Sequence, residues 1–243
     1  MITVENVEVY GFRHALRNMR NPKESWHLSD TQFVQSFEPN SYGFVVPVMP
    51  ELGPEDSRLI CSLERGGSEH RKVVRTIHVQ LDVVPWRGMW QELDTYKVAT
   101  VRDSCSTMHK LGHRDLVEDD FVDADVDSWM LDRLNELART YRESGFKDKE
   151  VLMKLKHRLP EGYLQRAGFD FNYETGLNIF FQRWNHSVPE WRWSGPNFER
   201  DWLDVKHSRW RGFCDVLWRL PLFDVLARAD QRWGEAQEHA GGV

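Results

Sequence analysis

The chain has few cysteines: its 243 residues contain three, Cys61, Cys105 and Cys214, and no CxxC pair. Cysteines this scarce and this far apart exclude a disulfide framework and a cysteine-based zinc cluster, and they favour a reducing cytoplasm. The ten histidines include no HExxH motif, so we predict no metal site. The chain also lacks GxGxxG and GxxxxGKS/T sequences, which excludes a Rossmann fingerprint and a P-loop.

Excess positive charge and long apolar runs are also missing. The formal net charge is −6, which argues against bulk nucleic-acid binding because that needs a basic surface. No stretch approaches the ~18 consecutive apolar residues of a membrane span. The first residues, MITVENVEVYGF, have neither the basic nor the apolar region of a secretory signal. We therefore expect a cytoplasmic protein that binds no membrane.

Tryptophan, by contrast, is abundant. The chain contains eleven tryptophans, which we expect at pockets or subunit contacts. A hydrophobic content of 40% and a charged content of 29% are ordinary for a soluble globular protein. We expect one domain over residues 1–243, long enough to bury a sizeable core.

Apolar periodicity predicts a few strands early in the chain and helices later. Strands are expected at residues 2–12 and 71–84, where apolar and polar residues alternate. Residues 22–54 hold five prolines and are expected to form a long irregular excursion. Helices are expected at residues 13–22, 53–67, 86–100, 129–145, 148–158, 173–186 and 210–220. This pattern predicts the α+β class.

Two details of the helical half are specific enough to test. The apolar stripe of the helix at residues 129–145 is expected to consist of Trp129, Leu131, Leu134, Leu137, Ala138 and Tyr141. An acidic hinge at residues 116–127 precedes this helix. The tail at residues 235–243 is expected to fray.

One stretch, DTYKVATVRDSCSTMHKL at residues 94–111, concentrates polar and reactive side chains. Lys97, Arg102 and His109 flank Cys105 and would activate its thiolate as a nucleophile. The alternative is that Cys105 is a small packing residue in a polar turn. We favour the alternative, because no third group is in place to orient a base.

Three further motifs each allow two interpretations. The RGGSEH turn at residues 65–70 is either a phosphate cradle or a helix end followed by a turn. The basic run at residues 149–158 is either a solvated helix face or the source of one cation for a ligand phosphate. Near residues 172–186, one polar helix face would contact the edge of a heterocycle. Its members are Asn178, Gln182, Arg183 and His186.

Taken in chain order, these motifs resemble the flavin-dependent thymidylate synthases. In that family a helix ends in a Gly-His-x-Ser/Thr turn leading to Glu-His, which Glu69 and His70 match. A strand follows, and then a helix that enters the signature R-H-R-x-x-S-x-N-E-x-S-x-R-Y, where residues 94–111 stand. The C-terminal half matches through Lys156, Leu159, Pro160, Asn172, Asn178, Arg183 and His186. The resemblance covers residues 1–192 and is strongest over 60–192.

The signature departs from the family pattern. Thr95-Tyr96-Lys97 stands in place of R-H-R, and Thr100 replaces the first Ser. Asp103 replaces the Glu, and Ser106 replaces the second Ser if one residue is inserted around Ser104. Met108-His109 stands in place of the late Arg-Tyr. In the family these positions help to hold the phosphates of flavin and nucleotide. Arginine binds phosphate bidentately and lysine only as a point charge. The changes therefore predict chemistry shifted from ordinary thymidylate synthesis.

The resemblance implies a fold and an activity. The implied fold is that of a flavin-dependent thymidylate synthase, with a small mixed or antiparallel sheet and several helices. The implied activity is methyl or hydroxymethyl transfer to C5 of a pyrimidine deoxynucleoside monophosphate, dUMP or dCMP. The implied cofactors are FAD, methylenetetrahydrofolate and NADPH, and the implied assembly is a homotetramer.

The resemblance also implies roles for individual residues. Arg183 would be the catalytic residue, stabilising charge at O2 or N3 of the pyrimidine. The implied substrate-binding residues are Glu92, Ser104, Ser106, Lys156 and Arg183. The implied flavin-binding residues are Ser68, Tyr96, Lys97, Asp103, Asn172, Asn178 and His186. Two alternatives stay open: a flavin-independent enzyme that uses Cys105 as nucleophile on C6, and a non-catalytic nucleotide-binding oligomer.

Overall fold

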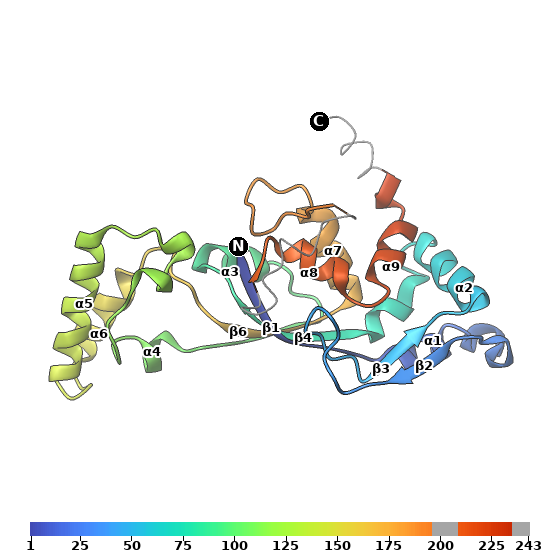
Figure 1. Ribbon diagram of the computed structural model, residues 1–243, viewed down its shortest axis with the longest axis horizontal. Helices are drawn as coiled ribbons and strands as arrows, with labels where there is room; N and C mark the ends of the chain where they lie inside the picture. The colour runs from blue at the N-terminus through green and yellow to red at the C-terminus, as the bar shows by residue number, and fades with distance from the viewer. Residues whose placement is uncertain (196–208, 235–243) are drawn as a thin grey trace. The chain divides into compact units, whose positions relative to one another are not determined.

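The structure, a computed structural model, describes residues 1–195 and 209–234 (Figure 1). The tail at 235–243 lies outside the described residues, and so its predicted fraying does too. The chain divides into two compact units. Unit 1 comprises Met1–Asp82, Lys97–Val101 and the described residues from Phe169 on, and unit 2 comprises Val83–Tyr96 and Arg102–Gly168. That they form one domain stays a prediction.

A five-stranded sheet has the strand order β5–β6–β4–β1–β7. The strands are β1 (Ile2–Tyr10), β4 (His78–Val84), β5 (Thr100–Ser104), β6 (Ala167–Asn172) and β7 (Arg209–Trp210). Strands β1 and β7 run antiparallel, with Ile2 opposite Trp210. Along β1 the buried side changes from Val4 to Val7, because Asn6 has a φ of 51° and shifts the alternation by one residue.

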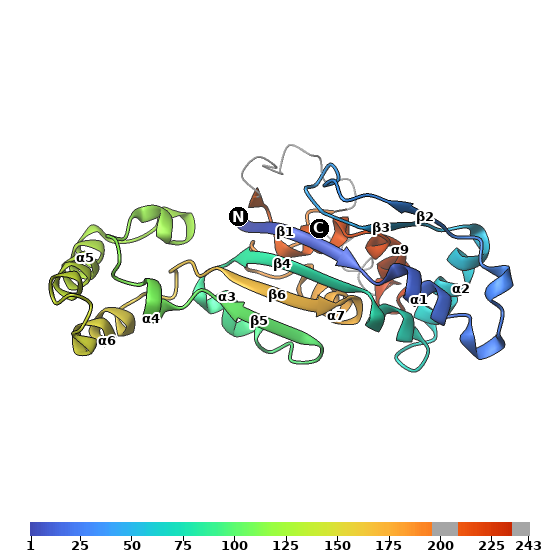
Figure 2. The same ribbon diagram turned by 90° about the horizontal axis from the view of Figure 1, so that it is seen from below.

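Helices α7, α8 and α9 of unit 1 lie on one face of this sheet (Figure 1), and Figure 2 shows the strands from the other side. The α-helices are α1 (Phe12–Asn18), α2 (Pro54–Arg65), α7 (Tyr173–Arg183), α8 (Phe213–Arg219) and α9 (Phe223–Ala229). The 3₁₀ helices are η1 (Asn21–Lys23), η2 (Trp26–Leu28) and η3 (Arg71–Thr76). The mixture of sheet and helices confirms the predicted α+β class.

The turn from β1 into α1 requires glycine. Gly11 has a φ of 102°, and a Cβ at this position would overlap the carbonyl oxygen of Thr76. The missing side chain lets α1 pack directly on η3.

Part of the excursion at residues 22–54 is regular, so the prediction of an irregular segment was wrong there. Strands β2 (Gln32–Gln35) and β3 (Val48–Glu51) form an antiparallel pair with Phe33 opposite Pro50. Proline is tolerated in a sheet of two strands because every strand is an edge.

A buried carboxylate ties this excursion to α2. Asp56 is fully buried and accepts hydrogen bonds from Arg20 Nε, Ser29 Oγ and Thr31 Oγ1, each at 2.6 Å. Burial alone would raise the pKa of Asp56, but these hydrogen bonds outweigh it and lower the pKa. Two segments of unit 1 thus converge on one side chain of α2.

Unit 2 is largely helical. Its helices are α3 (Arg87–Leu93), α4 (Thr107–Lys110), α5 (Ser128–Glu143) and α6 (Lys149–His157), with 3₁₀ turns η4 (Glu118–Asp120) and η5 (Val122–Ala124). Helices α5 and α6 pack together around Leu134, Leu137, Tyr141, Leu152 and Leu155. Within residues 1–195 and 209–234, every helix is too short or too polar to serve as a membrane span.

One residue of the predicted stripe on α5 lies outside the core. Leu134, Leu137, Ala138 and Tyr141 are buried as predicted. Trp129 is 66% exposed. At about 100° per residue, Trp129 lies roughly 140° around the helix from Leu134, which places it off the buried face.

Candidate functional site

Helix α7 begins at a buried amide that had been predicted to contact flavin. Asn172 is the N-cap: its Oδ1 accepts from the Thr175 N–H at 3.0 Å, and its Nδ2 donates to the Arg75 carbonyl at 3.3 Å. The side chain is 5% exposed. Both ends of the amide therefore start the helix, and contact of Asn172 with a cofactor stays a prediction.

Two other segments of unit 1 are held at the start of α7. The Arg75 guanidinium pairs with Glu174 through contacts of 2.7 and 3.0 Å, and it donates to the Ser68 carbonyl at 2.8 Å. Thr175 Oγ1 donates to the Val98 carbonyl at 2.8 Å. These bonds bring the glycine turn that carries Ser68 and the exposed Lys97 beside Val98 to the same end of the helix.

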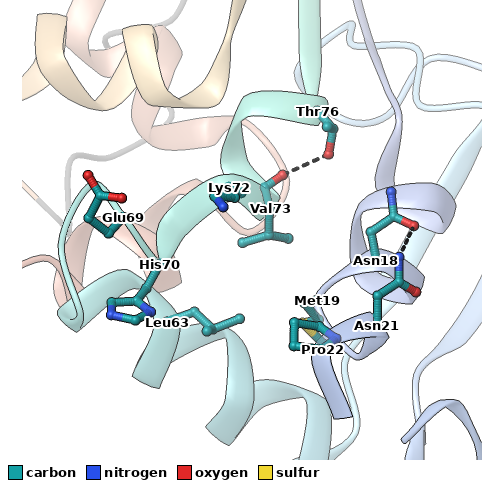
Figure 3. A pocket seen from close by; sticks show the side chains of 10 residues that line it. All are labelled: Asn18, Met19, Asn21, Pro22, Leu63, Glu69, His70, Lys72, Val73 and Thr76. Carbon is teal, nitrogen blue, oxygen red and sulfur yellow. Dashed lines mark hydrogen bonds between the residues drawn. The ribbon is translucent and has the colours of Figure 1, made fainter. Parts of the chain in front are cut away.

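A cavity of about 550 Å³ lies beside the residues that follow the glycine turn (Figure 3). It is lined by Asn18, Met19, Asn21, Pro22, Leu63, Glu69, His70, Lys72, Val73 and Thr76. Apolar walls, two amides and the Lys72 ammonium suit a flat heteroaromatic ligand that carries an anionic group. Glu69 and His70, the pair matched to the family's turn, both line this cavity.

A guanidinium and an imidazole meet at the end of α7. Arg183 Nη1 lies 2.9 Å from His186 Nε2, and the guanidinium lies over the Trp191 ring at 5.0 Å. The Val188 N–H lies 3.2 Å from His186 Nδ1, so both ring nitrogens face N–H groups, and a neutral ring can accept from only one of them. The Arg183 guanidinium carries five N–H donors, a group suited to a carbonyl or anionic oxygen.

The predicted helix at residues 173–186 is three residues too long, because α7 ends at Arg183. His186 therefore lies beyond the helix, and its N–H donates to the Arg183 carbonyl at 3.0 Å. The turn, rather than helical spacing, brings the ring of His186 to Arg183. Gln182, which shares the predicted polar face, is exposed.

Asn178 has a partner that the sequence did not indicate. Its Oδ1 accepts from Arg232 Nη1 at 2.9 Å, and the Arg232 guanidinium lies over Phe181 at 4.4 Å. No local motif marks Arg232, because 54 residues separate it from Asn178. The sequence feature that pointed to this region was its high content of arginine and tryptophan.

The stretch at residues 94–111 contains regular structure, but the predicted helix at 86–100 does not extend into it. Helix α3 ends at Leu93, before Thr95, and residues 100–104 form β5. Ser106 caps the short α4 by accepting from the Met108 N–H at 3.2 Å. The signature-like residues are therefore spread over a turn, a strand and a cap.

The other predicted site residues of unit 2 lie on three elements. Asp103 and Ser104 are exposed on β5, and Lys156 is half-buried near the end of α6. Glu92 lies on α3, and Tyr96 lies in the turn after it. Unit 1 holds Ser68, Lys97, Asn172, Asn178, Arg183 and His186, and unit 2 the remaining predicted site residues.

Cys105 is exposed, and its backbone is held on both sides. Its N–H donates to the Arg166 carbonyl at 2.9 Å, and its carbonyl accepts from Gln165 Nε2 at 3.1 Å. Arg102, one of the cations expected to activate the thiol, instead lies over the Trp90 ring at 4.0 Å and pairs with Asp94 at 2.6 Å.

The fold has known counterparts. The crystal structure of the flavin-dependent thymidylate synthase ThyX from Helicobacter pylori, complexed with FAD and dUMP, is similar with a TM-score of 0.55. The similarity covers 76% of this chain and 86% of that chain at 16% identity. A second structure of Helicobacter pylori ThyX with FAD and dUMP has a TM-score of 0.54 at 17% identity, covering 77% and 86%. This chain has the fold of a flavin-dependent thymidylate synthase.

The predicted fold class, including its several helices and antiparallel pairing, is thereby confirmed. No protein-family model matches the sequence, and no curated protein sequence matches it either. At 16–17% identity the likeness is one of fold, so the activity is a separate question that depends on the site residues.

Proposed function

We propose that this protein is a flavin-dependent enzyme that transfers a one-carbon unit from methylenetetrahydrofolate to C5 of dUMP or dCMP, with NADPH as reductant. The observation that carries the proposal is its fold, which is that of an enzyme solved with FAD and dUMP. The polar groups arranged along α7 add support, because they are the residues for which the resemblance implies contacts with flavin and pyrimidine.

The residues of unit 1 fit a flavin. The cavity beside the glycine turn offers an apolar wall for a ring and the Lys72 ammonium for a phosphate. The side-chain oxygen of Asn178 accepts a hydrogen bond from Arg232, so the N–H₂ group of the same amide is the part that would donate to a carbonyl or ring nitrogen of the flavin. Lys97, where the family has an arginine, would contribute a point charge rather than a bidentate contact.

Arg183 would act on the pyrimidine. Its guanidinium is fixed between the face of Trp191 and the His186 ring, so its donors keep one orientation. In a site that excludes water, such fixed donors stabilise negative charge that develops on O2 or N3 as C5 becomes nucleophilic. Lys156 and Ser106 would bind the nucleotide phosphate, and Glu92 and Ser104 would complete the substrate contacts.

FAD, when bound, supplies the hydride that the transferred carbon needs. The protein's own contribution is to bind, orient and desolvate. Trp191, whose ring lies under the Arg183 guanidinium, is fully buried and packs against the buried Phe213, and this low-polarity backing strengthens the guanidinium's interactions. No protein nucleophile is required, and a role of Cys105 is therefore not part of the proposal.

We further propose a homotetramer in the cytoplasm. Large apolar side chains are exposed in both units: Phe37 is 76% and Trp129 is 66% exposed. Exposed aromatic residues of this size are typical of subunit contacts. Light scattering of the purified protein at micromolar concentration would give the mass of the assembly.

The test is a titration of purified protein with FAD, followed by visible absorption. We expect a flavin spectrum that stays with the protein after gel filtration and that shifts on addition of dUMP or dCMP. Release of tritium from nucleotide labelled at C5, dependent on methylenetetrahydrofolate and reductant, would establish turnover. A protein that stays colourless with excess FAD and releases no tritium would overturn the proposal.

A further inference from the structure

The contact on Asn178 is the end of a chain of charged side chains in unit 1. Arg232 reaches Asn178 with Nη1, and its other two guanidinium nitrogens bind Asp230: Nε to Oδ1 at 2.9 Å and Nη2 to Oδ2 at 2.6 Å. The Asp230 side chain is 4% exposed. This bidentate pair fixes the plane of the guanidinium, so the direction of Nη1 toward the amide is fixed too.

The chain continues to helix α2. Asp230 Oδ2 also accepts from Arg71 Nη1 at 2.9 Å, and the same Nη1 lies 3.2 Å from Glu64 Oε1. Arg71 Nε lies 3.5 Å from Glu174 of α7. We call the series Glu64–Arg71–Asp230–Arg232 the relay. It joins α2, η3 and the end of α9 to the amide on α7.

We propose that Arg232 is a positioning residue that holds the Asn178 amide with its N–H₂ group turned to the ligand side of α7. This inference rests on the proposed function, because it takes FAD as the ligand. An amide can rotate by half a turn and exchange donor for acceptor. A guanidinium can only donate, so its contact with Oδ1 selects one of the two orientations.

The selected orientation has a chemical consequence for the ligand. Asn178 offers two N–H donors and no carbonyl oxygen, so it recognises a carbonyl oxygen or an unprotonated ring nitrogen. The heteroaromatic edge of a flavin carries both groups. Without Arg232 the amide would sample both orientations, so about half of the molecules would present the donor to the ligand and FAD affinity would fall about twofold.

The buried end of the relay makes it sensitive to pH. Burial raises the pKa of Glu64 to about 7, Arg71 opposes this rise and Asp230 adds to it. The charged groups that face Glu64 are Arg71 from η3 and Asp230 from the end of α9, with Glu174 of α7 beyond Arg71.

The direction of the pH effect follows from the charges. Below pH 7 Glu64 is protonated, and its carboxyl group donates a hydrogen bond toward Asp230. Arg71 then pairs mainly with the Asp230 carboxylate. Above pH 7 the ionised Glu64 repels the neighbouring Asp230 carboxylate. Asp230 anchors Arg232, so its displacement loosens that anchor and FAD affinity should fall between pH 6 and pH 8.

A double-mutant cycle on FAD binding tests the positioning role. N178A should weaken FAD binding about fivefold, the range of one neutral hydrogen bond, and R232A about twofold, because about half of the amide population is then in the wrong orientation. In the N178A background, R232A should have no further effect, because Arg232 acts through that amide. R228A is the matched control: Arg228 lies on α9, four residues before Arg232, and its guanidinium lies over Trp218 and Trp233, so its removal should leave FAD affinity unchanged.

The outcomes separate this inference from the proposed function. Wild-type protein that binds no FAD would overturn both. Wild-type protein that binds FAD, with additive losses in R232A and N178A, would overturn the positioning role alone. E64Q should bind FAD with the same affinity at pH 6 and pH 8. If the FAD affinity of wild type is also the same at both pH values, Glu64 has no part in positioning Arg232. A further measurement without FAD is hydrogen exchange at the backbone amides of residues 230–233, expressed relative to the intrinsic exchange rates. This relative rate should rise with pH more in wild type than in E64Q.

Discussion

The polar residues around α7 and those at 94–111 are held very differently. Around α7, Asn172 binds the backbone of Arg75 and Asn178 binds Arg232, while the Arg183 guanidinium lies over the ring of Trp191. In the stretch at 94–111, Asp103, Ser104, Cys105, His109 and Lys110 are exposed. One region is preorganised by the fold, and the other keeps its functional groups in solvent.

This difference indicates where binding specificity resides. A preorganised donor loses little entropy when a ligand arrives, whereas an exposed side chain must first be ordered. Residues around α7 should therefore contribute most of the affinity for a pyrimidine and a flavin. Substitutions in the stretch at 94–111 should have smaller effects on binding by the isolated chain.

The largest effect is expected at Arg183. R183A should weaken dUMP binding by about 100-fold, because a fixed, charged donor to the base is lost. R183K should be intermediate, since an ammonium keeps the charge but not the planar donors. Isothermal titration calorimetry with dUMP measures both.

Arg192 supplies the control for Arg183. It is exposed and donates to the carbonyls of His186 and Ser187, so R192A removes one cation from the same segment. Equal losses in R183A and R192A would mean that charge alone, rather than the position on α7, determines nucleotide affinity.

The next effect is a pH dependence of opposite sign in the two units. The folded-state pKa of Glu64 is raised to about 7, so the native state binds an extra proton between pH 4.5 and 7. Stability should therefore fall as pH rises through this window, by about 3 kcal/mol. Urea unfolding at pH 5 and pH 8 measures the fall, which E64Q should abolish.

Asp120 of unit 2 provides the contrast. Burial would raise its pKa, but the ion pair with Arg114 and the Val117 N–H outweigh burial and lower it. Its stabilisation is complete above the unfolded pKa and is lost as pH falls through the lowered folded value. D120N should thus weaken stability at pH 7 and matter less near pH 3. A wild-type curve that stays flat from pH 5 to pH 8 would refute the Glu64 assignment while leaving Asp120 untouched.

A smaller effect compares two helix caps of similar chemistry. N172A should destabilise the protein by about 1–2 kcal/mol, because a buried cap and its bond to Arg75 are lost. S106A removes the cap of the four-residue α4 at the surface and should cost about 0.5 kcal/mol. Thermal unfolding of both variants gives the ranking, and a larger loss in S106A would reverse the contrast drawn between the regions.

The smallest effect is expected at Cys105. C105A should bind FAD and dUMP and turn over like wild type, because the exposed thiol has its flanking Arg102 engaged elsewhere. A steady-state assay is sufficient. Loss of turnover with intact binding would instead favour the nucleophile that the sequence left open.

Sequence pattern was sufficient for elements whose periodicity is long. Helices α2, α5, α6 and α7 were predicted near their observed bounds because each presents a regular apolar face. Strand β6 was missed, although Ala167, Phe169 and Phe171 alternate with less apolar residues. Helix α9 was missed because Pro221 was taken as an end, whereas Leu222, with a φ of 61°, turns the chain into another helix.

For the site, local sequence indicated residue types but not their partners. Asn178, Arg183 and His186 stood out from spacing and from the family resemblance. The roles of Arg232 and Arg71 depend on contacts across 54 and 159 residues, and no local pattern encodes such distances. The amide of Asn172 looked like a ligand contact because a helix cap and a binding residue draw on the same amino acids.

The buried carboxylate of Asp56 bears on how the chain can be cut or extended. Residues 22–54 have the proline content of a tolerant surface loop, yet Ser29 and Thr31 are bonded to a side chain that is fully buried on α2. Exposing the backbone near residue 30 breaks the hydrogen bonds from Ser29 and Thr31 to Asp56. Because Asp56 is buried on α2, opening of this segment is coupled to unfolding of α2. A protease should therefore cleave near residue 30 only at the rate of global unfolding, and a tag inserted there would prevent the protein from folding.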